Sequence, residues 1–237
     1  MLRNIQQPAK FVFMDMILAD NIQHLTENIG FKNDEIIWLY THFTDIKIAP
    51  TTYTVDQVLA GFDGRPTREE KDGKVKRFFY EDQDSFLTCY LRSQDSPYVE
   101  RCEYVSRGIL VRKDYFSYTR YCTEYFIPKN NQANLIERRF YNEDGSVAYS
   151  MQMADGREIY LGRQELIRYF MQSLNLTKQD IVILDRETNI GQPIFEEAQK
   201  ARLGVVVHAE HYSVNSTDEQ YILWNNYYDY QFTNADK

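Results

Sequence analysis

The sequence predicts an α/β domain that is interrupted by a long inserted antiparallel β-sheet. At both ends of the chain, short apolar runs typical of buried parallel strands alternate with stretches of helical periodicity. In between, apolar and polar residues alternate with the period of two that marks strands. We therefore expect three segments: 1–44 and 163–237 as two parts of one Rossmann-like domain, and 45–162 as the inserted sheet.

The first segment reads as strand, helix, strand. Residues 10–14 form a short apolar run, and apolar residues with helical spacing follow from Asp15 to about Glu27. Gly30 is a typical residue for ending that helix, because glycine adopts the left-handed conformation at little cost. A second buried strand is expected over 35–40.

The middle segment predicts a meander of six to nine antiparallel strands. Thr54 and Gln57 have the spacing of a capping box, which indicates a short helix before the sheet. The longest alternating run predicts one strand over 114–126, and since both of its faces are half apolar, we expect cover on both sides. Asp144-Gly145 is a hairpin signal between two later runs.

In the third segment the helical period returns. The pattern predicts a helix over 163–174, a buried strand over 180–185 and a helix from Pro193 to about Ala201. A fourth strand is expected over 204–207. Ser216 and Glu219 then match a capping box before a last helix.

Composition excludes several classes of protein. Lysine plus arginine total 27 against 35 acidic residues, a net charge of −8, which argues against a protein that coats nucleic acid. The three cysteines are widely spaced and predict free, buried thiols in a reducing compartment rather than zinc ligands. No signal peptide and no membrane-spanning run are visible, so we expect a cytoplasmic protein.

Polar clusters follow two of the expected strands, at the end where α/β sheets bind ligands. One cluster covers 185–192 and the other 208–211, with His208 and His211. The alternatives are a charged loop that caps the next helix and a metal-free pair of surface histidines. Because a strand end lacks the helical face of common zinc sites, we expect one imidazole to hydrogen-bond a substrate hydroxyl. His24 and His42 carry no expected function, and no glycine-rich phosphate loop is found in the sequence.

The tyrosine-rich run around 115–126 suggests a peptide-binding platform, with ordinary sheet core as the alternative. We place Tyr118 and Arg120 on one strand face, where Arg120 donates to peptide carbonyls. A salt bridge from Arg120 to Glu124 is the equally weighted alternative.

Five runs resemble one specific family, the catalytic glycosyltransferase of the accessory Sec system. They are DMILADNI at 15–22, KDYFSYTRYC at 113–122, ILDRET at 183–188, VVHAEHYS at 206–213 and ILWNNYYDY at 222–230. The resemblance covers almost the whole chain. Wall teichoic acid glycosyltransferases with a similar inserted sheet are similar at lower specificity.

The resemblance implies a GT-B fold, in which this chain is part of the first Rossmann-like domain with its inserted β-sheet. It implies retaining transfer of N-acetylglucosamine (GlcNAc) from UDP-GlcNAc to Ser and Thr of serine-rich repeat adhesins, the initiating step of their glycosylation. His208, Arg186 and His211 would contact the donor sugar, with no cofactor and no metal. A non-catalytic glycosyltransferase-like subunit is the implied partner, and the complex would associate peripherally with the membrane.

Two departures from the family lead us to expect a truncated fragment. The family's first strand with its glycine-rich loop and its second Rossmann domain with a Glu-x7-Glu element are not found here. We therefore expect an acceptor- and partner-binding piece that is inactive alone. The alternatives are a non-catalytic, chaperone-like binding module and a related teichoic acid transferase.

Overall fold

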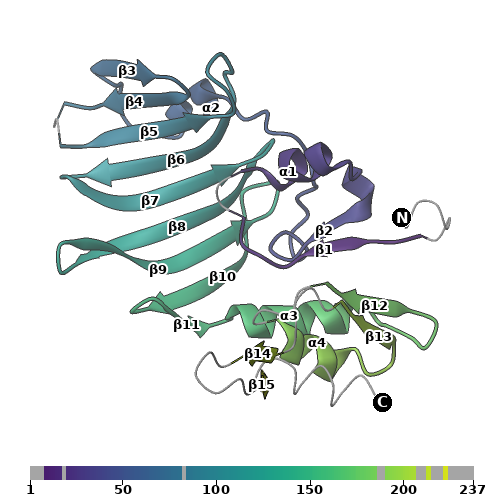
Figure 1. Cartoon of the computed structure of the whole chain (residues 1–237). Coiled ribbons are helices and arrows are strands. Elements are labelled where there is room, and N and C mark those ends of the chain that lie inside the picture. The colour runs from purple at the N-terminus through teal and green to yellow at the C-terminus, as the bar shows by residue number, and fades with distance from the viewer. Residues whose placement is uncertain are drawn as a thin grey trace. The chain divides into compact units, whose positions relative to one another are not determined.

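The computed structural model describes residues 8–17, 20–81, 84–185 and 190–206, together with the backbone of 212–214 and 221–223. The chain divides into two compact units, residues 1–162 and 163–237 (Figure 1). The predicted donor-side residues Arg186, His208 and His211 lie outside the described residues.

The N-terminal part of the first unit is the expected strand–helix–strand. Strand β1 (Phe11–Phe13) pairs in parallel with β2 (Ile36–Trp38), and α1 (Ile22–Ile29) and a single 3-10 turn, η2 (Asn33–Glu35), lie between them in sequence. Helix α1 begins later than predicted, because the side chain of Asn21 caps it by accepting from the backbone N–H of Gln23. Gly30 ends it with φ 94°, as predicted.

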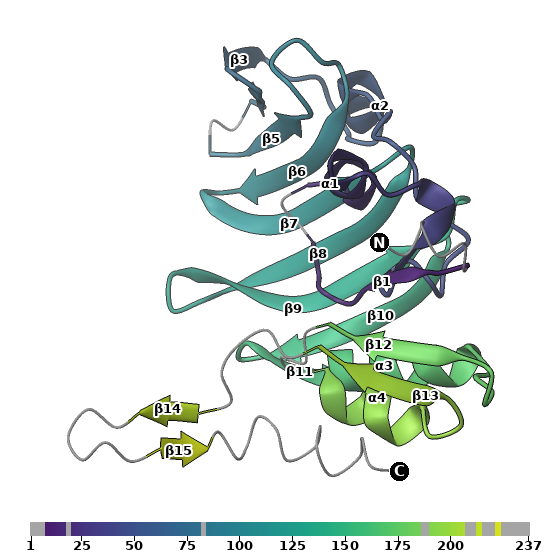
Figure 2. The ribbon, with the colours of Figure 1, turned by 45° about the vertical axis from the view of Figure 1, so that its right-hand side comes forward.

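Nine antiparallel strands follow in one sheet, in the order in which they occur in the chain. Figures 1 and 2 show them as a continuous curved sheet. The hairpin between the seventh and eighth of these strands turns at Gly145, whose φ of 82° suits glycine. The strands are β3 (Arg68–Asp72), β4 (Val75–Phe79), β5 (Phe86–Leu91), β6 (Val99–Ser106), β7 (Ile109–Phe116), β8 (Arg120–Lys129), β9 (Gln132–Tyr141), β10 (Val147–Ala154) and β11 (Arg157–Tyr160).

The prediction of one strand over 114–126 is wrong. A turn at 117–119 separates β7 from β8, which pair with each other. The backbone of Ser117 leaves the sheet: its carbonyl accepts from the N–H groups of Thr52 and Tyr53, and its N–H donates to the carbonyl of Thr119. Alternation alone does not reveal this turn, since it contains neither glycine nor proline.

Helix α2 (Val55–Ala60) opens with the predicted capping box of Thr54 and Gln57. Its apolar side packs on one face of the sheet, where the core includes Cys89, Cys102 and Phe116. All three cysteines are free and buried, as expected.

The opposite face of the sheet is covered in part by the end of β2 and the residues that follow. Trp38 packs edge-on against Tyr121 at 5.5 Å between ring centroids, and Tyr40 stacks on Phe140 at 5.7 Å. Register places Tyr121 and Phe140 on the face opposite to Asp114. The expectation of cover on both sides is therefore confirmed.

The second unit contains α3 (Arg163–Ser173), β12 (Ile181–Leu184), α4 (Gly191–Glu197), β13 (Arg202–Val205), β14 (Tyr212–Val214) and β15 (Tyr221–Leu223). Strands β12 and β13 are parallel, and α3 buries Leu166, Ile167 and Phe170.

Two predictions for this unit are wrong. The strand over 180–185 was expected to be buried, but Ile181 and Ile183 are each 59% exposed, because β12 has one neighbouring strand among the described residues. Residues 221–223, where the helix after Ser216 was expected, form β15, which pairs with β14, whereas Ser216 and Glu219 lie outside the described residues. None of the helices in the described part of the chain is long and apolar enough to cross a membrane.

Candidate functional site

Each parallel strand pair ends at an edge where α/β sheets bind ligands. In the second unit, Leu184 of β12 lies directly opposite Val205 of β13. The two predicted polar runs, which start at Asp185 and His208, therefore follow neighbouring strand ends. Residues 186–189 and 208–211, and with them Arg186, His208 and His211, lie outside the described residues, so the roles of these three residues stay predictions.

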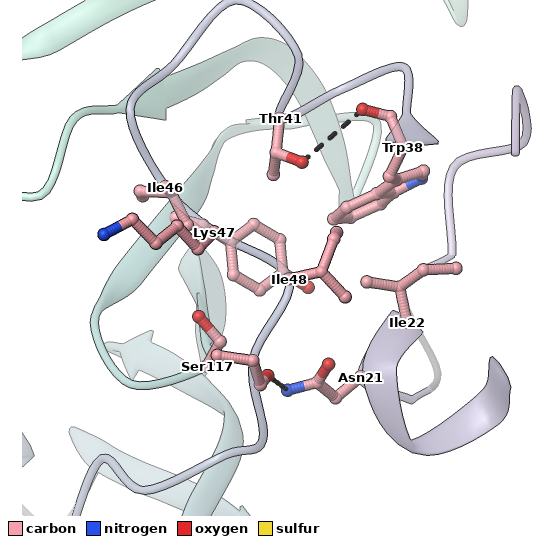
Figure 3. Close-up of a pocket in the computed structure, with 10 residues that line it drawn as sticks. Asn21, Ile22, Trp38, Thr41, Ile46, Lys47, Ile48 and Ser117 are labelled. Atoms are coloured by element: carbon pink, nitrogen blue, oxygen red, sulfur yellow. Dashed lines mark hydrogen bonds between the residues drawn. The ribbon is translucent and has the colours of Figure 1, made fainter. Parts of the chain in front are cut away.

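In the first unit, the carboxyl ends of β1 and β2 are joined by Trp38, whose indole N–H donates to the carbonyl of Asp15 at 2.9 Å. A small pocket opens beside them (Figure 3). Ile22 and Ile48 point toward the Trp38 ring across it, and Ser117 of the β7–β8 turn lies on another side.

The pocket is a junction rather than a sugar site. Its free space is about 10 Å³, room for about one water molecule. The side chain of Asn21 connects the start of α1 to the segment 49–51, donating to the hydroxyl of Thr51 at 2.8 Å and to the carbonyl of Ala49 at 3.1 Å. The hydroxyl of Ser117, 6% exposed, has no hydrogen-bond partner among the described residues, which suits a bound water.

Tyr118 does not share a strand face with Arg120, so that prediction is wrong. It lies in the β7–β8 turn, and its hydroxyl joins two other loops. The hydroxyl accepts from the backbone N–H of Lys47 at 3.0 Å and donates to the carboxylate of Glu143. Partial burial, and next the bond to Glu143, raise the pKa of Tyr118. These contacts assign Tyr118 a structural role in holding the loops together.

Replacing Tyr118 with phenylalanine should therefore lower the free energy of unfolding by about 1 kcal/mol. The ring stays, but the link between the Lys47 and Glu143 loops is lost. Urea denaturation of the wild type and the variant measures the difference. Tyr160→Phe, at a tyrosine 64% exposed on β11, is the matched control and should change stability little. Equal effects of the two changes would contradict the structural role.

Arg120 lies on the same sheet face as the buried carboxylate of Asp114, 3.9 Å away, and stacks over the ring of Tyr141 at 4.3 Å. The alternative salt bridge to Glu124 is wrong, because Glu124 is held on the opposite face by Arg138 at 2.7 Å. The Arg120 side chain remains 32% exposed. Its guanidinium is thus positioned, with part of its surface open to solvent.

Two arginines that the sequence reasoning missed extend this arrangement. Arg112 lies over Phe62 at 5.3 Å, and Arg139 lies over Tyr125 at 4.8 Å. Asp114 lies directly opposite Thr123, and Thr123 lies directly opposite Arg139. Arg112 and Arg139 are therefore on the same face of the sheet as Arg120. Arg112 could have been placed on this face from the sequence, because it lies two residues before Asp114 on the same strand. Arg139 could not, because its position depends on how the strands pair. We call Arg112, Arg120 and Arg139, with Phe62, Tyr125 and Tyr141, the arginine–aromatic face.

The acids beneath this face fix the guanidinium groups. Asp114, 2% exposed, accepts from Arg112 Nε at 2.8 Å and from the Thr123 hydroxyl at 2.6 Å. Glu137 holds Arg139 through two bonds of 2.8 and 2.9 Å. Burial opposes the charge of Arg112, but the bond to Asp114 outweighs it and the pKa of Arg112 is raised. The arginines are therefore held over aromatic rings, and a guanidinium has five N–H donors, more than these acids use.

Comparison with known proteins agrees with this architecture. Residues 68–164 match the family model of the GtfA extended beta-sheet domain. The GtfA subunit of the UDP-N-acetylglucosamine–peptide N-acetylglucosaminyltransferase of Streptococcus gordonii is 66% identical over 244 residues, covering 100% of this chain and 48% of that protein. The corresponding Streptococcus pneumoniae subunit is 62% identical over 243 residues, covering 99% and 48%.

Solved structures match equally well. The pneumococcal O-GlcNAc transferase GtfA, crystallised with UDP and GlcNAc, superposes with a TM-score of 0.89 at 61% identity, over 99% of this chain and 48% of that chain. The fold is thus part of the first Rossmann-like domain of a GT-B glycosyltransferase that carries an inserted antiparallel sheet. The chain carries the GtfA extended beta-sheet domain, is similar along its whole length to GtfA subunits, and spans about half the length of the curated relatives it matches.

Proposed function

We propose that this chain serves in protein O-glycosylation, as the acceptor- and partner-binding part of an enzyme that transfers GlcNAc from UDP-GlcNAc to Ser and Thr of serine-rich repeat adhesins. The observation that carries the proposal is the 66% identity, along the whole chain, to a UDP-N-acetylglucosamine–peptide N-acetylglucosaminyltransferase subunit. The setting is the cytoplasm, in a complex with a glycosyltransferase-like partner subunit that associates peripherally with the membrane. A crystal structure of a GtfA/B complex matches this chain with a TM-score of 0.87, which supports such a partner.

On the donor side, the proposal assigns His208, Arg186 and His211 to the sugar. A neutral imidazole can donate to or accept from a sugar hydroxyl, and a guanidinium supplies donors for further oxygens. The transfer itself uses UDP-GlcNAc as the donor substrate, without a cofactor or metal. Because the relatives are about twice as long, we expect these 237 residues, produced on their own, to be inactive.

On the acceptor side, the proposal assigns the arginine–aromatic face to the adhesin polypeptide. An unfolded serine-rich segment offers backbone carbonyls and hydroxyls but few charges or apolar groups. Guanidinium N–H groups fixed over tyrosine rings match such acceptors and lose little side-chain entropy on binding. This face is therefore better suited to a hydroxyl-rich polypeptide than an apolar groove would be.

Binding of a fluorescent serine-rich peptide tests this assignment. Arg120→Ala and Arg139→Ala should each weaken binding roughly three- to tenfold, the loss of about one hydrogen bond. Arg77→Ala is the matched control, since Arg77 is exposed and stacks on Phe86 at 5.1 Å on the opposite face. Equal affinity in all three variants would remove the acceptor role from this face, and peptide binding lost only in Arg77→Ala would move it to the other one.

The second candidate is a non-catalytic, chaperone-like binding module for the adhesin and the partner subunit. The nine-stranded sheet, a large surface without nucleotide-binding features, favours it. A binding module does not need His208 or Arg186. Alanine at either position should leave the affinity of this chain for peptide and partner unchanged under both candidates. The candidates differ in transfer: only the enzyme role predicts that the same change, made in a full-length relative, abolishes GlcNAc transfer.

A further inference from the structure

An imidazole and two carboxylates meet at the start of α1. Asp20 directly precedes the N-cap residue of this helix, His24 lies one turn later, and Glu100 comes from β6 of the sheet. One ligand atom from each of the three side chains lies within 4.8 Å of the other two. The cluster therefore joins two elements that are far apart in the sequence.

The three side chains are partly exposed and partly oriented. His24 Nδ1 lies 3.1 Å from the Asp20 carboxylate, and both side chains are 36% exposed. This contact holds the imidazole beside the Asp20 carboxylate. The exposure leaves solvent access to the cluster for an ion and for a water ligand.

The electrostatics of the cluster favour a cation. Glu100 is half-buried on the sheet, and its carboxylate lies beside that of Asp20. A bound divalent ion would neutralise both carboxylates at once.

We propose that Asp20, His24 and Glu100 bind a zinc ion that links α1 to β6. The donor set favours zinc over magnesium or calcium, because the hard cations take oxygen ligands and avoid imidazole. Water completes the coordination at the exposed side. The ion is structural, carries no step of sugar transfer, and its presence does not depend on the proposed function.

The geometry needs little adjustment. Ligand atoms at zinc bond lengths in a tetrahedral site lie about 3.4 Å from one another. The ligand atoms of the cluster lie within 4.8 Å of one another, and binding zinc would require side-chain rotations that bring them closer, for which the partial exposure of all three residues leaves room.

The test uses the chain without a polyhistidine tag, stripped of metal and titrated with zinc or cobalt. We expect one zinc per chain, a visible absorption of bound cobalt and a rise in melting temperature with zinc. His24→Gln and Glu100→Gln should each weaken zinc binding by more than about tenfold and abolish the melting shift. Because the two residues belong to different elements, loss of fold in one variant leaves the other as a test.

The other histidines provide the controls. His42→Gln, at a site outside the cluster, should bind zinc like the wild type. A double change of His208 and His211 to glutamine examines the competing strand-end pair. Zinc binding lost in that double variant but kept in His24→Gln and Glu100→Gln would overturn the proposal, as would a wild-type chain that binds no zinc.

Discussion

Replacing Glu124 with alanine is expected to lower the free energy of unfolding by about 3–5 kcal/mol. Glu124 is 4% exposed, and it accepts from Arg138 Nε at 2.7 Å and from the hydroxyl of Tyr115 at 2.8 Å. Burial, followed by the charge of Glu124, raises the pKa of Tyr115, which keeps its hydroxyl protonated as the donor. Without the carboxylate, the partly buried guanidinium of Arg138 keeps its charge and has lost its partner.

A double-mutant cycle measured by urea denaturation tests this pair. Glu124→Ala combined with Arg138→Ala should cost less than the sum of the single changes, by about 1–3 kcal/mol, because the double variant leaves no unpaired charge. Asp155→Asn is the control, since Asp155 pairs with Lys129 on the surface and its loss should change stability by less than about 1 kcal/mol. Strict additivity of the two buried changes would contradict the pairing.

Replacing Phe140 with alanine is the second change with a large expected effect, a loss of about 3–5 kcal/mol. Phe140 is fully buried, between the ring of Tyr40 at 5.7 Å and that of Tyr149 at 4.6 Å. The hydroxyl of Tyr149 also donates to the carbonyl of Tyr40 at 2.7 Å. The cavity would therefore open where the segment after β2 rests on the sheet.

Calorimetry or denaturant unfolding measures the loss. Phe140→Leu keeps most of the apolar volume and should cost clearly less than alanine. Ile127→Ala, at an apolar side chain of β8 that is 45% exposed, controls for substitution within the sheet. A Phe140→Ala variant no less stable than Ile127→Ala would mean that the aromatic stack does not hold these parts together.

The pattern of the sequence predicts most of this fold, because its signals are local. Gly30, the Thr54–Gln57 capping box and the Gly145 hairpin each act within a few residues, and all three are found in the structure. The turn at 117–119 was missed, since it depends on bonds from Ser117 to Thr52 and Tyr53, far away in the sequence.

The pairing of strands far apart in the sequence also decides which side chains meet at the candidate site, and the sequence alone does not show this pairing. Arg120 and Glu124 are four residues apart on one strand, which suggested a shared face, but a shift of register at the start of β8 separates them. Their actual partners, Asp114 and Arg138, lie on neighbouring strands. Similarly, nothing local to His24 indicates Glu100, which is brought to it by the packing of α1 near β6.

One measurement tests the central claim, that this chain binds the acceptor and partner while the transfer chemistry needs more of the enzyme. The chain is co-expressed with its glycosyltransferase-like partner subunit and given labelled UDP-GlcNAc and a serine-rich peptide, and peptide capture and label are read from the same sample. The account predicts a captured peptide without label, and label when a full-length relative replaces the chain. Label on the peptide from the 237-residue chain, lost in His208→Ala, would show a complete donor site and contradict the account, and failure to capture the peptide would contradict its binding role.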